Sequence, residues 1–135
     1  MDQTEIVRRA FQAFADRDRE GLLAVVTPDV ELHFAASELA GKPTMSRRLD
    51  YSGHAGVRAW LLEAEEDFSR VTLDPRHVQA VGHDTVLVLG TIVFDGRPGS
   101  GGMTAGWIAR FRGERISRVE VHWDWSSART AAVAV

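Results

Sequence analysis

The stretch TVLVLGTIVF at residues 85–94 decides the fold class, because it is almost continuously apolar and rich in β-branched side chains. Such a run predicts a strand that is covered on both of its faces. Turn signals follow it at GRPGSGG, residues 96–102, and at Gly113-Glu114. The second half of the chain therefore predicts four antiparallel strands, over residues 71–81, 85–94, 103–112 and 115–125.

Pro75 and the last ten residues qualify this assignment of strands. Pro75 interrupts the first of the four strands, so that strand is expected at a sheet edge or with a bulge. Residues 126–135 are small and weakly apolar, and they are expected to form either a short helix or a frayed end.

The first half of the chain carries helical patterns instead. Within residues 1–15, after the expected N-cap Asp2, apolar side chains recur at helical spacing, at Val7, Ala10, Phe11 and Phe14. A short helix is expected over residues 18–26, with Asp18 as its N-cap and Thr27-Pro28 ending it. The other predicted elements are a strand at residues 30–34, a long loop at 36–53, and a third helix at 57–68.

Composition excludes several classes of protein. The 135 residues suffice for one domain, and the absence of cysteine excludes disulfides, thiol nucleophiles and cysteine-ligated zinc. A net charge of −3 without a polybasic run argues against partners such as nucleic acid or a membrane surface. No apolar run is long enough to span a membrane, and a cytoplasmic location is expected.

The order of elements predicts an α+β domain, with helices gathered on one side of an antiparallel sheet. This order, together with four local motifs, resembles the SnoaL-like branch of the nuclear transport factor 2-like family. The motifs are ADRD at residues 15–18, PDVELHF at 28–34, YSGHAGV at 51–57 and ISRVEVHWD at 116–124. The resemblance implies a single domain over residues 1–135, a cone-shaped α+β barrel whose curved antiparallel sheet wraps around the N-terminal helices and leaves a pocket.

The chain departs from two catalytic patterns of related proteins. Similarity to ketosteroid isomerases places catalytic positions near Ala10, Phe34 and Trp107, and none of these side chains transfers a proton. Similarity to limonene epoxide hydrolases places an aspartate where this chain has Val121. Both of these specific activities are therefore unsupported.

The sharpest polar signal is His122-Trp123-Asp124, which resembles the ending of SnoaL-type polyketide cyclases, where an aspartate and a histidine act as acid and base. Residues two apart on a strand face the same way, so His122 and Asp124 are candidate catalytic partners. The competing interpretation is structural, with Asp124 capping a short helix that follows the strand.

His33 is the third catalytic candidate, although its strand parity points it away from the pocket, as for Glu31. At those positions, an interface or solvated role is the alternative. A metal site built from His33, His122 and Asp124 would match the pattern of two histidines and one carboxylate, but the same parity argues against it. We therefore expect no metal and no cofactor.

Apolar side chains on the helices and on the inward faces of the strands predict the pocket wall. They are Phe14, Phe34, Trp60, Trp107, Val119, Val121 and Trp123. Plain core packing is the alternative role for the tryptophans.

An aromatic wall suits a small hydrophobic molecule, and the expected function is a cofactor-free isomerase, cyclase or hydratase acting on a polyketide- or terpenoid-like carbonyl compound. The alternative is a non-catalytic hydrophobic-ligand binder or a dimerisation domain. Charged residues on the outer face of the last strands favour a homodimer.

Overall fold

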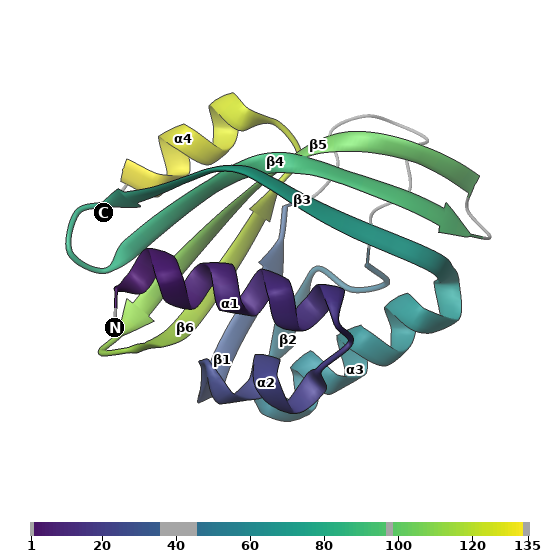
Figure 1. The fold of residues 1–135 in the computed structure, drawn as a ribbon, viewed down its shortest axis with the longest axis horizontal. Coiled ribbons are helices and arrows are strands. Elements are labelled where there is room, and N and C mark those ends of the chain that lie inside the picture. Colours follow the sequence, from purple (N-terminus) through teal and green to yellow (C-terminus); the bar gives the residue numbers. More distant parts are fainter. Residues whose placement is uncertain (1, 36–45, 97–98, 134–135) are drawn as a thin grey trace.

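A six-stranded sheet covered by helices on both faces forms the domain (Figure 1). The computed structural model describes residues 2–35, 46–96 and 99–133. The helices are α1 (Gln3–Ala15), α2 (Arg19–Ala24), α3 (Gly53–Asp67) and α4 (Trp125–Val133). The strands are β1 (Val26–Phe34), β2 (Asp50–Ser52), β3 (Phe68–Val81), β4 (Thr85–Gly96), β5 (Gly99–Arg112) and β6 (Arg115–His122).

The strands follow the order β2-β1-β6-β5-β4-β3, and the α+β class expected from the sequence is confirmed. Helices α1, α2 and α3 lie on the concave side of the curved sheet, here called the inner face (Figure 1). Helix α4 lies on the opposite side, the outer face. In the described part of the chain, β2 pairs only with β1 and β3 pairs only with β4. The curved sheet therefore has two free edges and is not closed into a barrel.

One detail of the predicted sheet is corrected, because β1 runs parallel to β6. The other pairs are antiparallel, so the sheet is mixed. The direction of β6 relative to β1 depends on the path of the chain through β2, α3 and three further strands before β6 reaches β1. Local hydrophobic patterns carry no information about that path.

Helices α1 and α2 begin where the sequence predicts, whereas α3 begins at Gly53 rather than at residue 57. The Asp2 carboxylate accepts a hydrogen bond from the Thr4 N–H at 3.2 Å, and Asp18 accepts one from the Gly21 N–H at 2.9 Å. These side chains satisfy backbone donors that a helix leaves free in its first turn. The expected edge position of Pro75 is also confirmed, since β3 is an edge strand whose register shifts between Pro75 and His77.

Several boundaries differ from the prediction. Strand β1 begins at Val26 rather than Val30, since the chain accommodates Pro28 where the β1–β6 register shifts. The predicted loop at residues 36–53 contains the three-residue strand β2 and the start of α3, while residues 36–45 lie outside the described residues. Part of the predicted turn at 96–102 is strand, because Gly99–Gly102 pair with β4. Short or glycine-rich strands lack the alternation that makes strands visible in a sequence.

Strand β4 is buried on both faces, as its composition predicts. Val86, Val88 and Ile92 belong to the main core under α1 and α3. On the outer face, Leu87, Leu89 and Ile108 form a second core with α4. The C-terminal segment is thus a helix, and it is held by apolar burial.

Gly106 permits the contact between α4 and β5. A β-carbon at this position would lie 2.3 Å from the β-carbon of Ala128, which is too close for two carbon atoms. The absence of a side chain at residue 106 therefore sets the distance between helix and sheet.

We expect Gly106→Ala to lower the free energy of unfolding by about 1–3 kcal/mol, the usual cost of overpacking a core. The double variant Gly106→Ala/Ala128→Gly removes the clash and should recover part of that loss, less the cost of a glycine within a helix. Denaturant unfolding of the three proteins measures both effects. Equal stabilities of the wild type and Gly106→Ala would contradict the contact.

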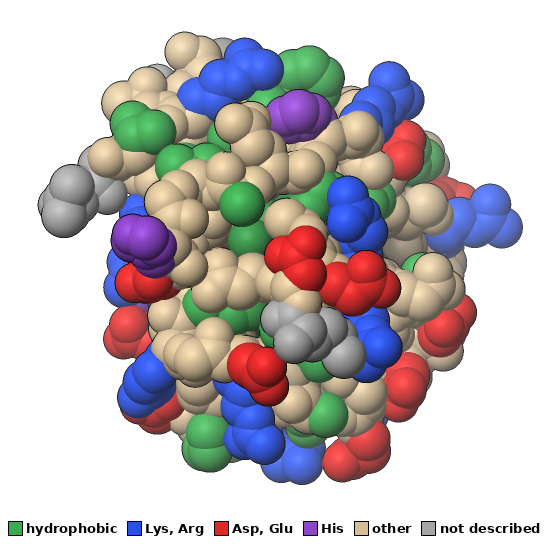
Figure 2. All heavy atoms as spheres, turned by 60° about the vertical axis from the view of Figure 1, so that its left-hand side comes forward, with side chains coloured by type: hydrophobic (Ala, Val, Ile, Leu, Met, Phe, Trp, Pro, Cys, Tyr) green, Lys and Arg blue, Asp and Glu red, His purple; other side chains and the backbone are tan. Residues whose placement is uncertain are grey.

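The surface carries acidic and basic side chains side by side. Figure 2 shows them interspersed over the end of the molecule where the two termini lie. This arrangement agrees with the small net charge of −3.

Candidate functional site

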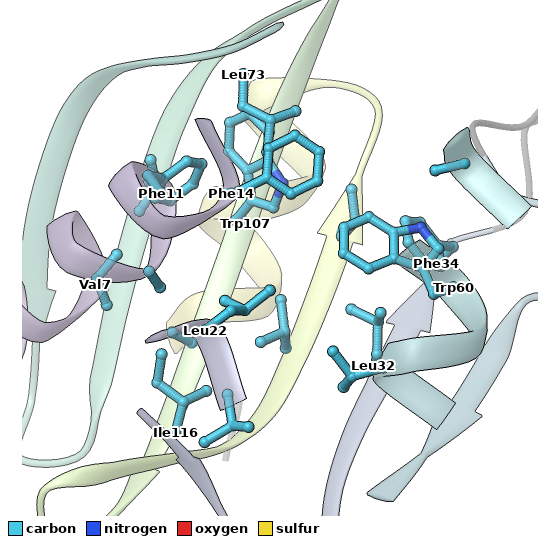
Figure 3. A pocket seen from close by; sticks show the side chains of 18 of the residues that line it. Val7, Phe11, Phe14, Leu22, Leu32, Phe34, Trp60, Leu73, Trp107 and Ile116 are labelled. Carbon is cyan, nitrogen blue, oxygen red and sulfur yellow. The ribbon is translucent and has the colours of Figure 1, made fainter. Parts of the chain in front are cut away.

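A cavity of about 130 Å³ lies between α1, α3 and the inner face of the sheet (Figure 3). Among the residues that the structure describes, every side chain that lines it is aliphatic or aromatic. Helix α1 contributes the stripe that its periodicity predicts, Val7, Ala10, Phe11 and Phe14. The cavity is therefore the space that this stripe leaves above the sheet.

Aromatic contacts fix the distance between the helices and the sheet. The Phe11 ring meets Trp107 of β5 edge-on, with centroids 5.0 Å apart. The Phe14 ring stacks on Trp60 of α3 at 5.6 Å. Because aromatic side chains are large and have few rotamers, these pairs act as rigid spacers around the cavity.

Strand alternation supplies the sheet side of the wall. Trp107 and Val121 are direct neighbours on β5 and β6, and Val119 lies two residues before Val121 on the same face. On β1, the Phe34 ring contacts Trp60, with ring centroids 5.9 Å apart, and stacks on Trp123, with ring centroids 6.3 Å apart.

Indole N–H groups are the only polar side-chain atoms on this wall, as far as the described residues go. They belong to Trp60 and Trp107. The Trp60 Nε1 is buried and makes no hydrogen bond within the described residues. A buried donor without a partner is costly, so this atom would gain from an acceptor on a bound molecule. The wall itself offers no carboxylate, imidazole or hydroxyl to a ligand.

Of the residues predicted for the wall, Phe14, Phe34, Trp60, Trp107, Val119 and Val121 line the cavity. Trp123 is not among the described lining residues. It lies behind Phe34, and its indole N–H donates to the Ala35 carbonyl at 2.6 Å. Sequence reasoning missed Leu73 and Val71 of β3, because this strand shows no clean alternation.

Asp124 lies at the start of α4, where it has the capping geometry that the sequence left open. Its carboxylate accepts hydrogen bonds from the Ser127 N–H at 2.7 Å and from the Ser127 hydroxyl at 2.6 Å. These bonds favour the ionised form, and they hold the pKa of Asp124 below its ordinary value.

The two histidine candidates lie on the outer face of the sheet. His122 is the strand neighbour of Gly106, which contacts α4, and its buried Nε2 makes no hydrogen bond with any residue that the structure describes. The His33 Nδ1 contacts the Asp50 carboxylate, and its Nε2 lies 3.8 Å from Glu31. No group of three or more potential ligands among the described residues could hold a metal ion.

The family follows from comparison with known proteins. Residues 7–119 match the family described as the SnoaL-like domain. The chain belongs to this family. Solved structures of nuclear transport factor 2-like proteins support the fold of this SnoaL-like domain over nearly its full length.

Three solved structures illustrate the similarity. A protein of unknown function from Burkholderia pseudomallei is 25% identical, with a TM-score of 0.78 over 99% of this chain and 100% of that one. TerC, co-crystallised with polyporic acid, is 25% identical, with a TM-score of 0.75 over 98% of each chain. A putative polyketide cyclase from Sinorhizobium meliloti is 20% identical, with a TM-score of 0.69 over 87% of this chain and 94% of that one.

No curated protein matches this SnoaL-like domain. Within the described residues, no helix is both long and apolar enough to cross a membrane.

The capping role of Asp124 predicts a pH-dependent stability difference. Since folding lowers the pKa of this carboxylate, it stabilises the fold above its ordinary pKa, and the contribution is lost as pH falls through the folded-state value. We expect Asp124→Ala to lower the melting temperature at pH 7, and the gap to the wild type to begin narrowing as pH falls below about 4. Asp124→Asn retains an acceptor for the Ser127 N–H and should keep most of the stability. An unchanged melting temperature in Asp124→Ala, together with loss of ligand binding, would contradict the cap.

Proposed function

We propose that this SnoaL-like domain binds a compact, largely apolar small molecule in the cavity between α1, α3 and the sheet. The observation that carries the proposal is the wall itself, whose described side chains are all aliphatic or aromatic. Burying apolar ligand surface there is favourable by roughly 25 cal/mol for each Å² removed from water. No described charged group on the wall would have to be desolvated.

The size of the cavity limits the ligand. A volume of about 130 Å³ is close to that of an engineered apolar cavity of about 150 Å³ that binds benzene. A single ring or a branched aliphatic body therefore fits without movement of the wall. Within the described residues the buried Trp60 N–H makes no hydrogen bond, and a carbonyl oxygen that reached it would satisfy this donor. A polyketide- or terpenoid-like carbonyl compound has this chemistry, and the similarity to TerC, crystallised with polyporic acid, supports a small organic ligand.

A cofactor-free isomerase, cyclase or hydratase acting on such a compound is the second candidate. His122 and Asp124, with His33, would then move the proton. The feature in its favour is the resemblance of His122-Trp123-Asp124 to the ending of SnoaL-type polyketide cyclases. Neither His122 nor Asp124 lines the cavity, and the Asp124 oxygens are engaged by Ser127, so binding is the better supported function.

We also propose that two copies associate through the outer face of β1 and β6. The Arg118 guanidinium lies 3.2 Å from a carboxylate oxygen of Glu31 and 3.9 Å from one of Glu120. The Arg110 guanidinium lies 3.3 Å from the other Glu120 oxygen. Helix α4 packs over β4 and β5 and leaves this half of the outer face to the charged residues. A twofold axis would bring such alternating charges onto their opposites.

Ligand binding is tested with 4-phenylbutan-2-one, a neutral ketone with one aromatic ring. Since Trp107 lines the cavity, we expect the ketone to quench tryptophan emission, and Trp107→Phe to remove much of the response. Trp125→Phe should keep the response, because the Trp125 N–H donates to Gly90 and its ring packs against the outer core.

A filled cavity provides the matched control. Ala10→Phe places a ring inside the cavity and should weaken binding at least about tenfold, while Ala55→Phe adds the same ring to an exposed site on α3 and should change nothing. Calorimetry measures the affinities, and thermal melts confirm that both variants fold. Equal affinities of these two variants would overturn the assigned site.

The dimer is tested by light scattering, for which we expect about twice the chain mass of 14.9 kDa at micromolar concentration. Arg118→Glu puts like charges together across the proposed contact and should give the mass of one chain. Arg76→Glu makes the same change on the edge strand β3 and should leave the dimer intact. A wild type with the mass of one chain would disprove the contact.

A further inference from the structure

A second cavity of about 80 Å³ adjoins the main one. The two share part of their walls, namely Phe14, Leu22, Ala64, Phe68 and Val71. The second cavity lies where the turn from α1 into α2 faces α3 (Figure 1). These shared apolar side chains connect the main cavity to the region of this turn.

The second cavity differs in having charged residues on its wall. They are Arg17, Asp18, Arg19 and Glu65. The Arg19 guanidinium pairs with Glu65 at 2.6 Å, and Asp18 accepts the Gly21 N–H that begins α2. Within the described residues, the Arg17 guanidinium has no hydrogen-bond or ion-pair partner. Arg17 is thus the cation on this wall that can pair with an anion from outside, although the acids Asp18 and Glu65 make the net charge of the wall zero.

The backbone holds Arg17 in a conformation that favours glycine. Its φ is +55°, in the left-handed region, where a β-carbon is unfavourable. The Arg17 N–H donates to the Phe14 carbonyl at 3.1 Å, and the Asp18 N–H donates to the Ala13 carbonyl at 2.8 Å, so residue 17 ends α1 as a glycine commonly does. An arginine therefore occupies a position where glycine would be more stable.

We infer that the two cavities together bind an amphipathic anion, whose apolar body fills the main cavity and whose carboxylate pairs with Arg17. This inference rests on the proposed function, because the apolar body occupies the same site. A guanidinium recognises a carboxylate through two parallel N–H···O bonds, and such charge-assisted bonds are stronger than neutral ones. The shared apolar wall suits a short methylene chain that joins the ring to the acid.

The test compares 4-phenylbutanoate with 4-phenylbutanamide, which have nearly the same shape and differ in charge. At pH 7 and low salt we expect the wild type to bind the acid about tenfold more tightly than the amide. The preference should shrink as salt is raised, because Arg17 is exposed. Calorimetry gives both dissociation constants.

Arg17→Gly separates the ligand role from the structural one. Glycine relieves the left-handed backbone, so the melting temperature should hold or rise. At the same time the acid should lose its preference, while the affinity for the amide stays unchanged. Arg9→Ala removes an exposed positive charge from α1 and should keep the preference, which controls for net charge.

The outcomes distinguish the inference from the function on which it rests. Equal binding of acid and amide to the wild type, or an unchanged preference in Arg17→Gly, overturns the role of Arg17. Binding of 4-phenylbutan-2-one would still uphold the main cavity in that case. If neither the ketone, the acid nor the amide binds, the proposed function itself fails.

Discussion

The structure depends on how the apolar stripe of α1 is buried against a sheet that curves away from it. A straight helix meets a concave surface along its margins, and the centre stays open unless large side chains fill it. Phe11 on Trp107 and Phe14 on Trp60 hold the helices at that distance without filling the space. The cavity is thus a consequence of the same contacts that stabilise the domain.

Strand alternation keeps the charged groups away from this cavity. On β6, Val119 and Val121 face inward, while Arg118, Glu120 and His122 alternate with them and face outward. A shift of one residue in the register would exchange the two sets, so the inner apolar face fixes the pairing. The outer face is therefore free to carry ion pairs and the helix α4. A single strand thus contributes both to the cavity wall and to the charged outer face of the sheet.

The two cavities together form a gradient of polarity. The described wall of the main cavity is aliphatic and aromatic, whereas the second cavity has arginines and acids on its wall at the α1–α2 turn. In that turn the backbone of Arg17 has a left-handed conformation, which is energetically unfavourable for a residue other than glycine. The unfavourable conformation thus occurs at the charged end of the site. Under the proposed function, such a gradient selects a ligand by the position of its polar end as well as by its shape.

The sequence by itself determined the α+β class, the helical stripe of α1, the caps Asp2 and Asp18, and the doubly covered strand β4. These features depend on local periodicity and on side chains that act within a few residues. The tertiary structure alone decided the parallel pairing of β1 with β6, the short strand β2, and the place of Trp123 behind Phe34. It also brought Arg17 beside the shared cavity wall. Those features depend on contacts between distant segments, and no local pattern of residues encodes where such segments meet.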